Sequence, residues 1–181
     1  MNQIILISGS TGSGHLDVAL ALCERFDRML LINTNDLHGM IKAGFRYPWN
    51  TDKQSLEQDE LNVMNASVIA LNACLKRYSA IIVDSIFSEK LEWYKKFLVD
   101  AEVDIEFITL MPQLNIIEEK LLGSPLLEYS KVVHKKISAE IESKMLSGLV
   151  IDNSNDHNHS VTADRIQDAI SQSLALLDTS S

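Results

Sequence analysis

Five short apolar runs, spread along the whole chain, limit the folds that this sequence can adopt. The runs are rich in β-branched residues and are continuous instead of alternating with polar residues. That pattern is typical of strands buried on both faces of a parallel sheet. The runs cover residues 4–7, 30–32, 80–83, 105–110 and 149–151. A sheet built from them needs a layer of helices on each face.

Helical patterns fill the intervals between these runs. Apolar residues recur there at spacings of three and four, which predicts helices with one face toward the core. The patterned residues are Leu61, Met64, Val68, Leu71 and Leu75, then Val133, Ile137, Ile141 and Met145, then Ile166, Ile170, Leu174 and Leu177. We also expect Met64, Met111 and Met145 to be core residues. The sequence therefore predicts an α/β protein with three layers, in which residues 1–181 form a single domain.

A glycine-rich loop directly follows the first strand and precedes a helix. Its residues are Gly9, Ser10, Thr11, Gly12, Ser13 and Gly14. Glycines let successive backbone N–H groups point at one anion, and the helix that follows adds the positive end of its dipole. We therefore expect these six residues to bind a phosphate group of a cofactor, although the same loop could serve only as a tight strand–helix connection.

The end of this loop departs from the phosphate-binding pattern GxxxxGK(S/T). Gly9 and Gly14 have the required separation, but His15 replaces the lysine and Leu16 replaces the hydroxyl residue that binds Mg²⁺. We assign His15 to the cofactor site and leave three roles open: a phosphate contact, the lining of a repurposed pocket, or an exposed first-turn residue. We expect ATP to bind weakly, and the sequence leaves Mg²⁺ binding open.

Four stretches of the chain together match one protein family. They are residues 5–26, the pair NDLHGM (35–40) and GFRYPW (44–49), the strand IIVD (81–84) and the segment VIDNS (150–154). With these stretches the chain resembles the P-loop small-molecule kinases of the nucleoside-monophosphate-kinase-like class. It is most similar to the branch that holds chloramphenicol phosphotransferase, gluconate-kinase-like proteins and zeta-toxin-like ATPases.

This resemblance implies a P-loop NTPase fold with a five-stranded parallel sheet and helices on both faces. It implies phosphoryl transfer from ATP to a small acceptor hydroxyl or phosphate. It also implies a substrate-binding region over about residues 35–77 and a mobile lid over about residues 120–135. Asp84 takes the Walker B-like position, and Asn153 lies in the loop that flanks the adenine base in the family.

The resemblance also implies which residues act on the acceptor. Asn35 stands at the first position of the family's acidic pair and Asp36 at the second, so Asp36 and Asp84 are the candidate catalytic residues. Asn35, Arg46 and Trp49 are the candidate substrate-binding residues. Two alternatives stay open: Asp84 could cap the helix near Ser88, and Trp49, with Pro48, could close off the edge of the sheet.

The chain has five arginines, and none lies between Tyr78 and Asp164. The lid region is in that interval, where the resemblance implies arginines that stabilise transition-state charge. We therefore expect a kinase-like protein with weak or no phosphotransfer, which acts by binding a small-molecule ligand, a nucleotide or a partner. The alternative is a divergent kinase that phosphorylates a small-molecule hydroxyl or phosphate. The sequence leaves open whether the chain is an enzyme.

Charge and composition exclude other classes of partner. The formal net charge is -9, so we expect no nucleic-acid and no membrane partner. The short polar cluster Asp156, His157 and His159 lacks a third strong ligand, so we expect no metal site. Cys23 and Cys74 lie in apolar patterns, which favours free thiols in a cytoplasmic protein. A protein partner or a homodimer stays open.

Overall fold

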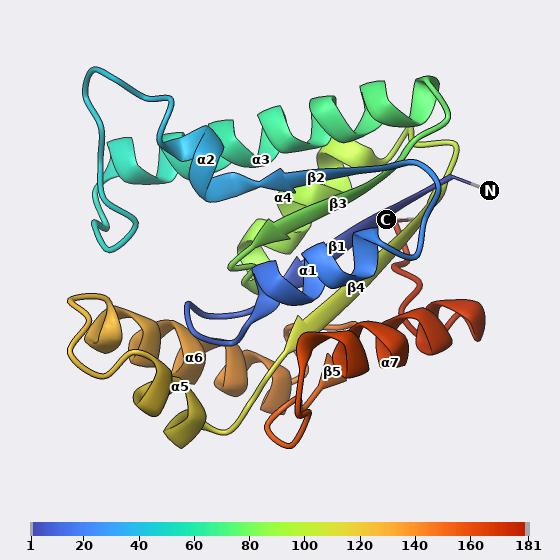
Figure 1. Ribbon diagram of the computed structural model, residues 1–181. Coiled ribbons are helices and arrows are strands. Elements are labelled where there is room, and N and C mark those ends of the chain that lie inside the picture. Colours follow the sequence, from blue (N-terminus) through green and yellow to red (C-terminus); the bar gives the residue numbers. More distant parts are fainter. Residues whose placement is uncertain (1, 180–181) are drawn as a thin grey trace.

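The computed structural model describes residues 2–179, so residues 1 and 180–181 of the predicted single domain lie outside it. Five strands form one parallel sheet in the order β2-β3-β1-β4-β5, as Figure 1 shows. All five predicted strands are confirmed; the apolar runs of β1, β3 and β4 are buried between layers of side chains, whereas those of the edge strands β2 and β5 are partly exposed. The strands are β1 (Gln3–Ser8), β2 (Met29–Asn33), β3 (Ser79–Asp84), β4 (Asp104–Leu110) and β5 (Leu149–Ile151).

Helices cover both faces of this sheet, so the three-layer α/β prediction is confirmed. The helices are α1 (His15–Cys23), α2 (Thr34–His38), α3 (Lys53–Leu75), α4 (Ser88–Leu98), α5 (Leu114–Lys120), α6 (Leu127–Glu142) and α7 (His159–Ser171). Residues of α3, α4 and α6 pack on one face of the sheet, and residues of α1 and α7 pack on the other. Among residues 2–179, no helix is both long and apolar enough to cross a bilayer.

The central strand β1 shows why the sequence produces two cores. Successive side chains of a strand point to opposite faces. Ile4 and Leu6 accordingly belong to the core under α3, α4 and α6, whereas Ile5 and Ile7 belong to the core under α1 and α7. All four side chains are fully buried, which accounts for the continuous apolar run that predicted this strand.

The parallel register brings the carboxyl ends of three strands to one edge of the sheet. Ser8 at the end of β1 pairs with Asp84 at the end of β3, and Asn33 at the end of β2 pairs with Val83. The loop after β1, the helix α2 after β2 and the segment after β3 therefore meet there. Ligands of open α/β sheets collect at such edges.

The buried face of α3 differs from the sequence prediction. The predicted core positions Leu61, Met64, Val68 and Leu75 are 41%, 38%, 50% and 79% exposed. The fully buried positions are instead Val63, Ala66 and Ala70. These small side chains let the helix lie close to the strands β2 and β3, and the longer apolar side chains therefore point away from the sheet. The helix was predicted correctly, but the assignment of Met64 to the core was wrong.

Two helices also end earlier than their apolar patterns suggest. Helix α6 ends at Glu142, and Met145 beyond it is 64% exposed, so its prediction as a core residue was wrong. Helix α7 ends at Ser171, and the chain then turns back so that Leu177 donates its backbone N–H to Ile105 of β4. Leu177 is buried, although it is not helical. Met111 is partly buried against the core.

A pair of substitutions tests the orientation of α3. Ala66→Glu places a carboxylate in the core and should lower the free energy of unfolding by about 3 kcal/mol or more, because a buried unpaired charge is costly. Val68→Glu places the same group on the exposed face and should change it by less than about 0.5 kcal/mol. Urea denaturation at low protein concentration measures both. Equal losses would contradict the orientation described here.

Candidate active site

The glycine-rich loop between β1 and α1 wraps closely around itself. A Cβ atom at Gly9 would lie 2.3 Å from the hydroxyl oxygen of Ser13, and Gly14 precedes α1 with a φ of 82°. The N–H of Ser13 bonds to the carbonyl of Ser10 at 3.0 Å. Within residues 2–179, no backbone acceptor is found for the N–H groups of Gly12 and Gly14. This geometry suits an anion at the N-terminus of α1.

His15 begins α1 directly behind this loop. Its Nδ1 shares a hydrogen bond of 2.9 Å with the Ser13 hydroxyl. Burial lowers the pKa of His15 from 6.5 to about 4, against the opposing effects of Asp84 and Asp17. The imidazole is therefore neutral at pH 7 and cannot supply the fixed positive charge that a lysine would bring to this position.

The side chains around the loop offer little to Mg²⁺ or to a triphosphate. Leu16 has no oxygen for the metal. Two buried polar atoms, Ser10 Oγ and Asn153 Oδ1, have no hydrogen-bond partner among residues 2–179. The Nδ2 of Asn153 meanwhile donates to the carbonyl of Ser13 at 2.9 Å and braces the loop. The backbone fits a phosphate group, but residues 15 and 16 do not fit a Mg²⁺–triphosphate complex.

A lysine side chain lies beside the loop. Lys120 Nζ, at the end of α5, would be 3.8 Å from a Cβ atom at Gly14, and His159 is closer still. Both side chains line a cavity of about 290 Å³ with Gly12, Gly14 and His15. In the described part of the chain, the Lys120 ammonium has no ion-pair partner. This lysine is therefore free to contact an anion in the loop.

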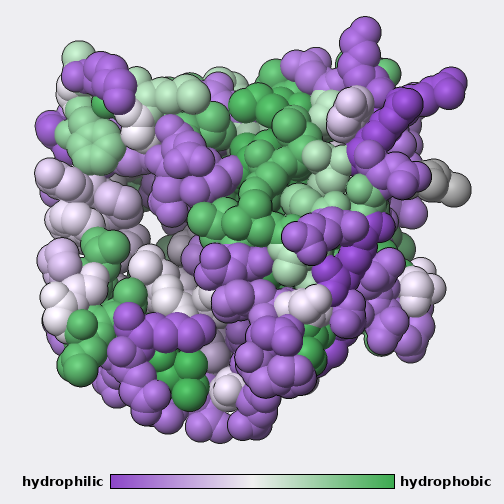
Figure 2. Space-filling model, viewed as in Figure 1, coloured by the Kyte–Doolittle hydropathy of each residue, from purple (hydrophilic) through white to green (hydrophobic). Residues whose placement is uncertain are grey.

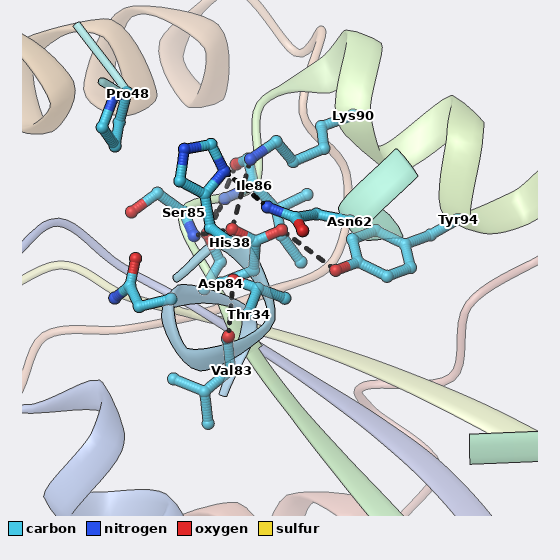
Figure 3. A network of polar contacts seen from close by, with 12 residues as sticks. Thr34, His38, Pro48, Asn62, Val83, Asp84, Ser85, Ile86, Lys90 and Tyr94 are labelled. Carbon is cyan, nitrogen blue, oxygen red and sulfur yellow. Dashed lines mark hydrogen bonds and ion pairs between the residues drawn. The ribbon is translucent and has the colours of Figure 1, made fainter. Parts of the chain in front are cut away.

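Asp84, at the end of β3, is the centre of a buried polar network (Figure 3). Its Oδ1 accepts from Lys90 Nζ at 3.2 Å and from the Ser85 N–H at 2.7 Å, and its Oδ2 accepts from Tyr94 Oη at 3.0 Å. The carboxylate is only 8% exposed. The residue that precedes α4 is Phe87, so Asp84 does not cap the helix near Ser88. Its negative charge is instead neutralised inside the protein.

The charges of this network depend on one another. Burial alone would lower the pKa of Lys90, but the carboxylates of Asp84 and Asp59 outweigh it and raise the pKa, so Lys90 stays charged. Burial and the Asp84 charge raise the pKa of Tyr94 well above its usual range. Burial also raises the pKa of Asp59, while Lys90 acts against it. Asp59 therefore holds a proton more readily than a surface carboxyl group.

A cavity of about 90 Å³ lies over this network. Its lining comes from six parts of the chain and includes Thr11, His15, Thr34, Asn35, His38, Pro48, Asp59, Asn62, Asp84, Ser85, Phe87, Lys90 and Tyr129. That volume is well below the roughly 300–1,000 Å³ of pockets that enclose drug-sized molecules. The cavity therefore suits a small molecule or one end of a larger molecule.

Residues 44–49, which we call the roof, reach this cavity through Pro48, the member of the segment that lines it. The His38 ring fixes them to α3, because its Nε2 bonds to the Arg46 carbonyl at 2.7 Å and its Nδ1 accepts from Asn62 Nδ2 at 2.8 Å. Trp49 stacks on Tyr47 with ring centroids 4.6 Å apart, and its edge meets Tyr129 of α6 at 5.6 Å. An aromatic ladder thus joins the roof to the lid region.

The predicted site residues separate into two groups. The loop residues Thr11 and His15, together with Asn35 and Asp84, line the same cavity. Asp36 is exposed and lines neither cavity, although its neighbour Asn35 lines both. The side chains of Arg46 and Trp49 also lie outside both linings: Arg46 pairs with Asp52 at 3.5 Å, and Trp49 contacts Tyr129 of α6. The functional roles of these residues stay predictions.

The sequence did not predict several residues of the site. Lys90 and Tyr94 are four apart in α4, so both face the strand end that carries Asp84. Asp59 and Asn62 are three apart in α3, on the side opposite the leucines that dominated the apolar pattern. In both cases the signal was a polar pair at helical spacing next to a strand end.

The lid region lies against the glycine-rich loop. Leu121, directly after α5, would be 3.2 Å from a Cβ atom at Gly12, and the hydroxyl of Ser130 in α6 donates to the Thr11 carbonyl. Lys131 is held by Glu118 at 3.2 Å and by Glu128 at 3.4 Å. No arginine lines either of the two cavities described here. Transition-state charge would therefore receive no guanidinium from this region.

Comparisons with known proteins agree with this fold. No protein-family model matches the sequence, and no curated protein matches it. The tunicamycin resistance protein of Deinococcus radiodurans is similar in structure, with a TM-score of 0.67 and 18% identity over 98% of this chain and 99% of that chain. The shikimate kinase of Acinetobacter baumannii, in complex with shikimate, is similar with a TM-score of 0.62 and 16% identity over 96% of this chain and 94% of that chain.

The APS kinase of Mycobacterium tuberculosis, in complex with AMPPNP and APS, gives a TM-score of 0.60 and 15% identity over 94% of this chain and 98% of that chain. These likenesses concern nearly the full length of each protein. The chain thus has a P-loop NTPase fold. Within that class, its fold is that of the P-loop small-molecule kinases, as the resemblance in sequence predicted.

The pKa of His15 predicts how stability depends on pH. The unfolded chain binds the proton near pH 6.5 and the folded chain only near pH 4, so stability should fall as the pH drops through this window. Between pH 7 and pH 5, His15 should account for a loss of about 1–2 kcal/mol. Urea denaturation of wild type and of His15→Gln at each pH gives the two free energies of unfolding, and their difference measures the contribution of His15. His157→Gln, at an exposed loop position, is the control and should leave the pH dependence unchanged.

Proposed function

We propose that this chain binds a small-molecule ligand in the cavity over Asp84, with weak or no transfer of phosphate. The observation that carries this proposal is the engagement of both Asp84 oxygens by Lys90, Tyr94 and the Ser85 N–H. A carboxylate at the Walker B-like position would need a free oxygen to hold the water shell of Mg²⁺. A buried ion pair occupies this carboxylate instead.

The charge of the site supports the same conclusion. Phosphoryl transfer needs cations around the transferred group. Here His15 is neutral at pH 7 and the lid lysine Lys131 is paired with two glutamates. The cavity itself holds Asp59 and Asp84 against the single lysine Lys90.

The lining of the cavity also limits the class of ligand. Asn35, Asn62 and Tyr129 offer hydrogen-bonding groups, whereas Arg46 is paired with Asp52 outside the cavity. An anionic ligand would find no unpaired lysine or arginine among the lining residues, because Lys90 is paired with Asp84. We therefore propose a small polar ligand that is neutral or positively charged. The likeness in fold to kinases of small molecules is compatible with a ligand of this size.

Thermal-shift titration with ATP, ADP and GTP, each with and without Mg²⁺, tests the loss of nucleotide binding. A bound ligand raises the melting temperature by linkage. We expect no Mg²⁺-dependent shift for wild type, and a shift for a His15→Lys, Leu16→Ser double variant, in which the lysine and the hydroxyl are restored. A Mg²⁺-dependent shift of wild type at micromolar ATP would contradict the proposal.

One observation favours a second function, a divergent but active kinase that phosphorylates a small-molecule hydroxyl or phosphate. Lys120 lies beside Gly14 without an ion-pair partner among the described residues, so it could supply the charge that His15 lacks. The resemblance would then leave Asp36 or Asp84 as the catalytic carboxylate.

The variant Lys120→Met separates these two functions. If Lys120 contacts phosphate, its loss should weaken the binding of ATP by about 10- to 100-fold, since a hydrogen bond to a charged group contributes about 1.5–3 kcal/mol. Isothermal titration calorimetry measures the affinity. Lys135→Met, which removes an exposed lysine of α6, is the matched control. Equal affinities for wild type and Lys120→Met would exclude this role for Lys120.

A further inference from the structure

The outer face of α3 carries a continuous row of apolar side chains, which we call the α3 seam. It consists of Leu61, Met64, Val68, Leu71 and Leu75. Four of them are exposed, and Leu71 is partly buried. The opposite face of the same helix is already packed on the sheet through Val63, Ala66 and Ala70. Apart from Leu71, which packs against the core, the seam residues point away from the sheet.

The seam lies in a segment without any charged residue. The chain has 16 basic and 25 acidic residues, yet none occurs from Leu61 to Leu75. A helix face that stays in water normally carries lysine and glutamate. Within this segment the exposed polar residues are the uncharged amides Asn65 and Asn72, and charged residues such as Glu57 and Glu60 lie before its first residue. This composition is typical of a face that another protein surface covers.

The apolar surface continues from α3 to the neighbouring edge of the sheet. Strand β2 pairs only with β3, so its outer edge is open. Ile32 of this strand belongs to the core under α3, and the strand period places Leu30 on the same side, where it is 37% exposed. Figure 2 shows hydrophobic residues gathered over α3 and β2.

We infer that the α3 seam is the contact surface of a homodimer, in which α3 packs antiparallel against α3 of a second copy. Alternate spacings of three and four are those of helices that interdigitate with a like helix. A two-fold axis at Val68 would place Leu61 opposite Leu75 of the partner subunit, so the surface is complementary to itself. Antiparallel packing also opposes the two helix dipoles favourably.

Charge favours a second copy as the partner. Two copies with a net charge of -9 repel each other over most of their surface. The uncharged seam is a place where they can approach and bury apolar area without removing charges from water. A partner selected by electrostatic attraction would instead require charged residues within the seam, and the segment from Leu61 to Leu75 has none.

The size of the seam sets the expected strength of the dimer. The segment from Leu61 to Leu75 is about 22 Å long. A single helix pair of this length, with Leu30 at its margin, is a small interface compared with the roughly 800 Å² per partner of standard stable complexes. We therefore expect a dimer with a dissociation constant in the micromolar range, independent of the ligand proposed for the active site.

Sedimentation velocity over a range of protein concentrations tests this inference. Wild type should change from monomer to dimer across the micromolar range, and Val68→Glu should stay monomeric. The control Val132→Glu makes the same change at a 65% exposed position of helix α6 and should dimerise like wild type. Added salt should strengthen the dimer, since it screens the repulsion between the acidic copies.

The outcomes separate the inference from its alternatives. A monomeric wild type at every concentration, or a Val68→Glu variant that dimerises like wild type, would overturn it. Circular dichroism shows whether Val68→Glu is folded, and Met64→Gln provides a milder second variant that should also weaken the dimer. In a Cys74→Ser background, oxidation should link two copies through Val68→Cys but not through Leu61→Cys. A disulfide through Leu61→Cys would contradict the antiparallel arrangement.

Discussion

The buried negative charge of Asp84 is the constraint on which the site depends. A carboxylate at the end of a central strand is costly unless a cation or several donors compensate for it. Lys90 and Tyr94 provide this compensation from α4, on the other side of a three-residue turn. The same lysine also acts on Asp59: burial raises the pKa of that carboxyl group, and the charge of Lys90 lowers it. The polar network therefore fixes the position of α4 and the charge of the cavity together.

Two arginines form ion pairs away from the site. Arg25, just beyond the end of α1, pairs with Asp164 of α7 at 2.6 Å, and Arg165 of α7 pairs with Asp156 at 2.9 Å. These contacts fasten α7 and the loop before it. An anion bound at the glycine-rich loop would therefore contact lysine, which offers a point charge without the planar fork of arginine. The placement of the arginines explains why few strong cations surround this loop.

Prediction from the sequence worked where one physical signal dominated. The strands were found because residues such as Ile5 and Ile81 are buried on a two-sided sheet, and the loop was found because its glycines have a fixed spacing. The buried face of α3 was missed because Ala66 and Ala70 contribute little to an apolar pattern that the larger seam residues dominate. The Asp84–Lys90 pair joins two elements, and the direction of a side chain between elements depends on packing that periodicity does not describe.

The aromatic ladder between the roof and α6 has an optical consequence. The protein has two tryptophans, and only Trp49 lies in this ladder, between Tyr47 and Tyr129. Trp93, in α4, is packed against the core. Indole emission responds to changes in contact and polarity, so any movement of the roof relative to the lid would alter the fluorescence of Trp49 and leave that of Trp93 as an internal reference. The molecule thus contains its own spectroscopic probe of access to the cavity.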